Sequence, residues 1–169
     1  MDYRVVLVED ETAIVELLGI VLAHPHIELH AAYNGLDGLA LIRRVKPDLV
    51  MLDVMLPGMD GWEVYDAIRV TPSLVQTPVI MISVVPERPE RRQAFLRSEI
   101  DLYVTKPFDA LRLRRAIAHM LGGEELWGPP SPEVLDVFEK SELPAASKPN
   151  KRPAQGPPGV AADAPEREA

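Results

Sequence analysis

The sequence predicts an α/β fold, a doubly wound sheet of five parallel strands with helices on both faces. Short, continuous apolar runs without helical period alternate along the chain with segments whose apolar residues recur at helical spacing. The loops between them are short. Two parallel strands must be joined by a crossover that is long enough to hold a helix, and this crossover is right-handed. Five such strand-helix units in series therefore indicate one parallel sheet covered on both sides.

The first unit combines a strand over residues 4–8 with a helix over 12–23. The strand is a fully apolar run after its first residue and stops at Glu9-Asp10-Glu11. The helix must end before Pro25, and it presents one apolar face made by Ile14, Leu17, Leu18, Val21 and Leu22.

The second and third units repeat this alternation. Residues 27–32 read as a strand, and 36–45 as a helix that Asn34-Gly35 opens. Residues 49–52 are again a buried apolar strand, closed by an aspartate, and a helix over 62–70 follows a turn that is rich in glycine and proline.

The fourth and fifth units complete the sheet. A strand over 79–82 precedes a charged helix over 90–97, with Pro89 near its first turn. A strand over 102–104 precedes the last helix, over 111–121. We therefore place one domain over residues 1–122.

The remainder, residues 123–169, differs in composition. It holds nine of the 17 prolines and no further set of apolar runs, so we expect it to be a largely disordered tail. One stretch, 132–140, has the pattern of a short helix: Ser131 can cap it, Pro132 suits its first position, and its apolar face holds Val134, Val137 and Phe138. Such a helix either docks on its own domain, forms only transiently, or binds a partner.

Charge and cysteine content exclude several classes of protein. A net charge of −8 argues against a protein that coats nucleic acid. The absence of cysteine excludes disulfides, a cysteine zinc site and a thiol nucleophile. The N-terminus resembles neither a signal peptide nor a membrane span, so we expect a cytoplasmic protein without direct contact to membrane or nucleic acid.

Polar side chains follow the predicted strands where each strand ends. Glu9 and Asp10 end the first, Asp53 ends the third, Ser83 ends the fourth and Lys106 follows the fifth. Ligands of open parallel sheets bind at this carboxyl edge. Clustered carboxylates without His or Cys favour Mg²⁺, and a lysine beside them can neutralise a phosphoryl oxygen. The pattern predicts a phosphoryl-transfer site.

Three segments in this order resemble the receiver domains of response regulators, which have a flavodoxin-like fold. The segments are VVLVEDE at 5–11, LVMLDVMLPGMDG at 49–61 and YVTKPF at 103–108, and the resemblance covers roughly residues 3–121. It implies a phosphorelay protein that accepts a phosphoryl group from a histidine kinase or a phosphotransfer protein. Such a domain catalyses only its own Mg²⁺-dependent phosphorylation and dephosphorylation and is not an enzyme for an external substrate.

The resemblance also assigns roles to the acidic and basic residues at the sheet edge. Asp53 matches the phospho-acceptor, which becomes an acyl phosphate. Asp10 matches a direct Mg²⁺ ligand and Glu9 the second acidic position, with Asp53 and the backbone carbonyl of Met55 completing the metal site. Lys106 matches the lysine that pairs with the phosphoryl oxygens.

Further matches describe a two-state switch. Ser83 corresponds to the hydroxyl that moves toward the phosphoryl group, Tyr103 to the aromatic ring that turns inward with it, and Pro107 to the position of a cis peptide bond. Phosphorylation would then change protein contacts through the face formed by helix 4, strand 5 and helix 5. The downstream target is unknown from sequence.

Two positions depart from the family pattern. Glu9 stands where aspartate is commoner, which changes reach but not charge. Val84 follows the switch hydroxyl, where the family usually has a small residue. We hypothesise that Val84, Val85 and Met55 shield the acyl phosphate and slow its hydrolysis.

Several alternatives remain beside this reading. An aspartyl-phosphate hydrolase would need a second aspartate where Met55 stands, and a flavin module would need a phosphate loop after the first strand. A degenerate receiver would be a constitutive scaffold.

The basic face around the fourth and fifth helices is either a solvated surface or the site of an acidic partner or homodimer. Its arginines are Arg88, Arg91, Arg92, Arg97, Arg112, Arg114 and Arg115.

Overall fold

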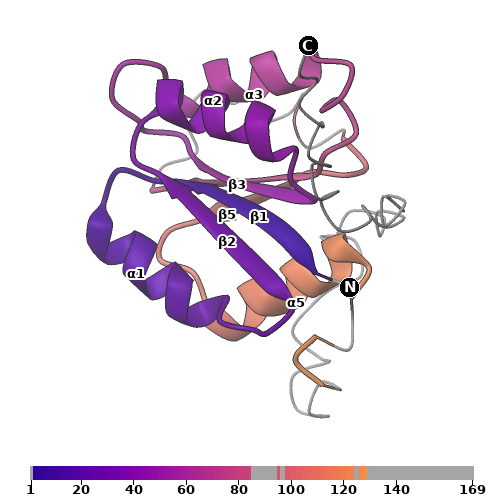
Figure 1. Ribbon diagram of the computed structural model, residues 1–169. Coiled ribbons are helices and arrows are strands. Elements are labelled where there is room, and N and C mark those ends of the chain that lie inside the picture. Colours follow the sequence, from indigo (N-terminus) through magenta and orange to yellow (C-terminus); the bar gives the residue numbers. More distant parts are fainter. Residues whose placement is uncertain (1, 85–94, 96–97, 124–125, 129–169) are drawn as a thin grey trace, which may run out of the picture.

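The computed structural model describes residues 2–84, 95, 98–123 and 126–128, which contain a five-stranded, all-parallel sheet (Figure 1). Its strand order is β2-β1-β3-β4-β5. The strands are β1 (Tyr3–Val8), β2 (Ile27–Ala32), β3 (Leu49–Asp53), β4 (Val79–Ser83) and β5 (Leu102–Thr105). The order reverses between β1 and β3, because β2 lies outside β1 while β4 and β5 follow on the other side.

Helices cover both faces of the sheet, as the doubly wound prediction requires. Figure 1 shows α2 and α3 on one face and α1 and α5 on the other. Their bounds are α1 (Thr12–Val21), α2 (Gly35–Val45), α3 (Gly61–Arg69) and α5 (Ala110–Leu121). None of the described helices combines the length and the apolar character that a membrane span requires.

Strand residues supply both halves of the core. Along β1, Val6 and Val8 point into the half under α2 and α3, whereas Val5 and Leu7 point into the half under α1 and α5. All four are fully buried. This alternation within a continuous apolar run is what a strand buried on both faces requires.

The predicted elements agree with the observed ones to within one or two residues at each end, apart from one helix. The helix predicted over 90–97 lies outside the described residues except for Phe95, which is buried against α3 and β5. The tail from residue 129 onward, with the helix predicted over 132–140, also lies outside them. The described chain continues past residue 122, where Leu126 and Trp127 pack against the core.

Candidate functional site

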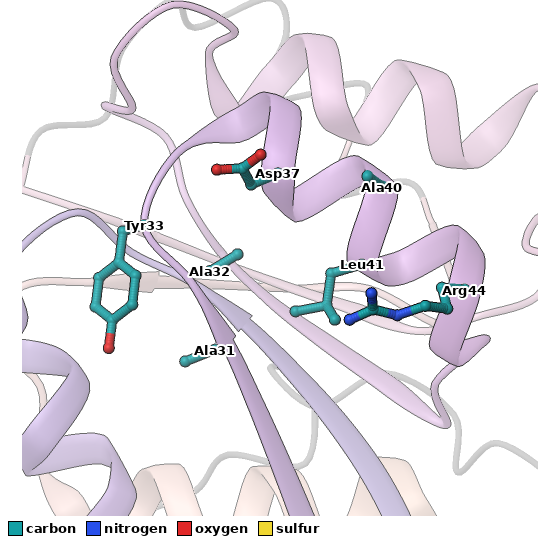
Figure 2. A pocket seen from close by; sticks show the side chains of 7 residues that line it. All are labelled: Ala31, Ala32, Tyr33, Asp37, Ala40, Leu41 and Arg44. Carbon is teal, nitrogen blue, oxygen red and sulfur yellow. The ribbon is translucent and has the colours of Figure 1, made fainter.

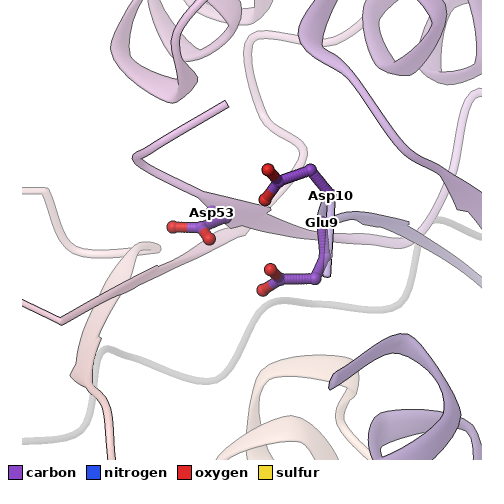
Figure 3. Close-up of side chains that lie close together, drawn as sticks. All are labelled: Glu9, Asp10 and Asp53. Atoms are coloured by element: carbon purple, nitrogen blue, oxygen red, sulfur yellow. The ribbon is translucent and has the colours of Figure 1, made fainter. Parts of the chain in front are cut away.

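Three carboxylates meet at the carboxyl edge of the sheet, beside the point where the strand order reverses. Each of Glu9, Asp10 and Asp53 offers an oxygen within 4.8 Å of the others, and Figure 3 shows their side chains converging from two neighbouring strand ends. Parallel pairing of β1 with β3 ends at Val8 and Leu52, which sets these acids side by side. Glu9 and Asp53 are buried and Asp10 is exposed.

Lys106 brings a positive charge to this cluster from the end of β5. Its Nζ lies 2.8 Å from Asp53 Oδ2 and 2.8 Å from Glu9 Oε2. Its backbone N–H donates to the carbonyl of Ser83 at 2.7 Å, which holds the segment after β5 against β4. The Lys106-Pro107 peptide bond is cis, as the family resemblance implied.

The electrostatics of the cluster follow from this geometry. Burial raises the pKa of Glu9 to about 7. The hydrogen bond from Lys106 lowers this pKa in part, and the negative charge of Asp53 raises it. Burial disfavours the ammonium of Lys106, but hydrogen bonds to Asp53 and Glu9 outweigh that cost and raise the lysine pKa. One lysine thus compensates only part of the negative charge, and the site favours a further cation.

The donor set fits Mg²⁺. All the side-chain donors are carboxylate oxygens, which are hard ligands, and Mg²⁺ typically takes one or two such groups and keeps several waters. Because Asp10 is exposed at the rim, a hydrated ion can reach the cluster from solvent. These residues are therefore a suitable binding site for a small divalent cation.

The loop between β3 and α3 holds the Asp53 carboxylate from the other side. The backbone N–H of Met55 donates to Asp53 Oδ1 at 3.1 Å. A side chain at Gly61 would place its Cβ 2.0 Å from the carbonyl oxygen of Asp53. The loop then enters α3 through a capping box in which Asp60 and Glu63 each accept a backbone N–H of the other.

The role of Gly61 was missed by the sequence reasoning. Its signal was a glycine immediately before a helical apolar pattern, which usually indicates only a turn. The close approach to Asp53 shows a second cause, because the backbone of the helix N-terminus must lie directly against the strand that carries the carboxylate.

Of the two predicted switch residues, Ser83 lies beside the site at the end of β4, and Tyr103 lies within β5. Ser83 is fully buried one residue beyond Ile82, the register partner of Asp53. Tyr103 is partly buried, with its ring 6.3 Å from that of Trp62 in a stacked arrangement and 6.2 Å from that of Phe95. The tyrosine therefore belongs to an aromatic cluster under α3.

Two further features lie away from the acids. A hollow of about 340 Å³ opens between β2 and α2 (Figure 2) and contains none of the predicted site residues; it is lined by Ala31, Ala32, Tyr33, Asp37, Ala40, Leu41 and Arg44. At the opposite edge of the sheet, buried Asp101 pairs with Arg69 and accepts hydrogen bonds from the Tyr65 hydroxyl and the Val79 N–H, each at 2.8 Å. Sequence patterns did not predict this network.

Comparisons with known proteins agree with this geometry. Residues 5–118 match the family model of the response regulator receiver domain. The transcriptional regulator RpaA of Synechocystis is 33% identical over 118 residues, covering 70% of this chain and 48% of RpaA. The response regulator PleD of Caulobacter vibrioides is 36% identical over 113 residues, covering 67% of this chain and 25% of PleD.

A solved structure gives the same result. A response regulator of Chloroflexus aurantiacus superimposes with a TM-score of 0.62 at 26% identity, covering 70% of this chain and 96% of that one. This chain spans about half of RpaA and a quarter of PleD, so the activities of those whole proteins do not transfer to it. The fold, the acidic site and these matches together show that the chain belongs to the response regulator receiver-domain family of two-component signalling.

Proposed function

We propose that this domain accepts a phosphoryl group on Asp53 from a phosphohistidine of a histidine kinase or phosphotransfer protein. An oxygen of Asp53 attacks phosphorus, the P–N bond to the histidine breaks, and the electron pair stays on the departing imidazole. The observation that carries this proposal is the position of Asp53 within the three-acid cluster. Its Oδ2 accepts a hydrogen bond from Lys106 Nζ at 2.8 Å. The domain would turn over no external substrate.

The neighbouring residues have separate roles in this proposal. Glu9, Asp10, Asp53 and the backbone carbonyl of Met55 would hold Mg²⁺, which neutralises negative charge on the phosphoryl oxygens when bound. Lys106 already lies beside the Asp53 carboxylate and would pair with a phosphoryl oxygen after transfer.

The switch would run from the phosphoryl group to the surface. The Ser83 hydroxyl would move toward the new phosphoryl oxygens, and Tyr103 would turn with it. Tyr103 already contacts Trp62 and Phe95, so its rearrangement would reach the face formed by the helix predicted over 90–97, β5 and α5. This face would then change its contact with a downstream protein or with a second copy of the domain.

Intact-mass measurement after incubation with acetyl phosphate and Mg²⁺ tests the proposal. The wild-type protein should gain one phosphoryl group, whereas Asp53→Asn, which keeps shape but removes the nucleophile, should gain none. Lys106→Ala should bind Mg²⁺ yet show a strongly reduced rate of gain. Equal gain in wild type and Asp53→Asn would place the acceptor elsewhere, and no gain despite Mg²⁺ binding would favour a scaffold without phosphoryl chemistry.

A further inference from the structure

The outer face of α1 is unusually apolar for an exposed surface. Leu17, which the helical spacing predicted on the apolar face with Leu18 and Val21, is instead 49% exposed. With Ile20, which is 71% exposed, and exposed Ala13, it forms one row along the helix, which we name the α1 stripe. A Cβ added at Gly19 would meet no atom within 4 Å, so the surface beside the stripe is open. Contiguous exposed apolar surface of this kind commonly marks an interaction site.

The C-terminal end of the described chain is fixed beside this stripe. Arg114 of α5 donates through Nε to the carbonyl of Val21 and through a terminal nitrogen to that of Ile20. The same guanidinium lies over the ring of Trp127, with Cζ 5.6 Å from the ring centroid. Trp127 also meets the ring of His24 edge-on at 5.8 Å, just after α1. The described chain therefore ends beside the C-terminal turn of α1.

The segment that follows is of the right length and composition to cover the stripe. Residues 132–140 begin four residues after Gly128, a span of at most about 13 Å. As a helix they would be about 14 Å long, close to the roughly 15 Å of α1 with its ten residues. Their apolar face holds Val134, Val137 and Phe138.

Charge favours the same placement. The segment carries Glu133, Asp136 and Glu139 against one lysine. α1 has Glu16 as its one charged residue, whereas the adjacent α5 carries three arginines, Arg112, Arg114 and Arg115. An acidic amphipathic segment can therefore place its apolar face on the stripe and its carboxylates toward α5.

We propose that residues 132–140 dock on the α1 stripe of their own chain, with the packing of Trp127 as the anchor that places them there. The docked segment removes Leu17 and Ile20 from solvent and covers a surface that begins two residues after Asp10. The contact is intramolecular, because the short connection from Gly128 gives the segment a high effective concentration at this face.

Disulfide trapping in the full chain tests the contact, since the chain has no native cysteine. The test pair is Ile20→Cys with Phe138→Cys. The matched control is Val70→Cys with Phe138→Cys, because Val70 is 80% exposed at the end of α3 on the opposite face of the sheet. In dilute protein under a mild oxidant, the test pair should form an intramolecular disulfide about tenfold faster or more than the control.

A further variant separates docking from mere proximity of the tail. Val134→Asp with Val137→Asp, added to the test pair, leaves the connection from Gly128 unchanged but removes the apolar face. It should reduce the disulfide rate toward that of the control. The proposal would be overturned if the aspartate variant kept the disulfide rate of the test pair, or if the test and control pairs formed disulfides at equal rates. Disulfides that form only between chains would also overturn it, because they would assign the stripe to a second copy.

Discussion

The ammonium nitrogen of Lys106 lies as close to Glu9 as to Asp53, with Nζ 2.8 Å from Glu9 Oε2. Glu9 is fully buried, and its longer side chain reaches a lysine that a phosphoryl group on Asp53 would also need. The lysine is therefore shared between two carboxylates. The protonation of Glu9 should decide how much negative charge the cluster presents to a cation.

Magnesium affinity should depend on pH through Glu9. Burial raises the pKa of Glu9 to about 7, so binding of Mg²⁺ below that pH must displace a proton. We expect affinity to rise by up to about tenfold per pH unit below that pKa and to level off above it. Calorimetric titration across this range measures the slope. Glu9→Gln should bind more weakly with a flatter profile, and a pH-independent wild-type affinity would refute the linkage.

The same group should affect stability in the absence of Mg²⁺. The folded-state pKa of Glu9 lies above the ordinary value of 4.5, so the folded chain binds this proton more tightly than the unfolded chain does. Its stabilisation is fully present below pH 4.5 and is lost as pH rises through about 7. Urea unfolding with a chelator should show a smaller pH-dependent loss in Glu9→Gln than in wild type. Identical profiles would contradict this assignment.

Gly61→Ala should disturb both stability and the site. The added Cβ would lie 2.0 Å from the Asp53 carbonyl oxygen, so the strand end or the start of α3 must shift. We expect a loss of about 1–3 kcal/mol in unfolding free energy and slower phosphorylation by acetyl phosphate. Gly19→Ala is the matched control, since its Cβ meets nothing and should stabilise α1 by up to about 1 kcal/mol.

The sheet, the helices α1, α2, α3 and α5, and the residues at the carboxyl edge of the sheet could be predicted because each has a local signal. Buried parallel strands read as continuous apolar runs, and the acids and lysine stand where those runs stop. The pairing of Lys106 with Glu9 had no such signal, since it joins residues 97 positions apart through side-chain reach. The contact of Gly61 with Asp53 and the placement of Trp127 likewise depend on packing between elements that no local pattern encodes.

Breaking the buried network around Asp101 should strongly destabilise the fold. Asp101 is 5% exposed and pairs with Arg69, while the Tyr65 hydroxyl and the Val79 N–H also donate to it. Asp101→Asn keeps the shape but leaves Arg69 without its counter-charge, which should cost about 3–5 kcal/mol. Tyr65→Phe removes one neutral donor and should cost only about 1 kcal/mol. Urea unfolding measures both, and similar costs would mean that the ion pair is not the dominant contribution.

The lifetime of phospho-Asp53 should depend on Val84. This side chain is 56% exposed directly after Ser83, and Met55 is 54% exposed two residues after Asp53, so both project at the rim of the site rather than into the core. There they can obstruct the path of a hydrolytic water to the acyl phosphate. We therefore expect Val84→Ala to shorten the phospho-Asp53 half-life severalfold, as measured by intact mass after removal of acetyl phosphate. Val70→Ala, an equally conservative change directly after α3, should leave the half-life unchanged, and an unaltered half-life in Val84→Ala would show that the water approaches by another route.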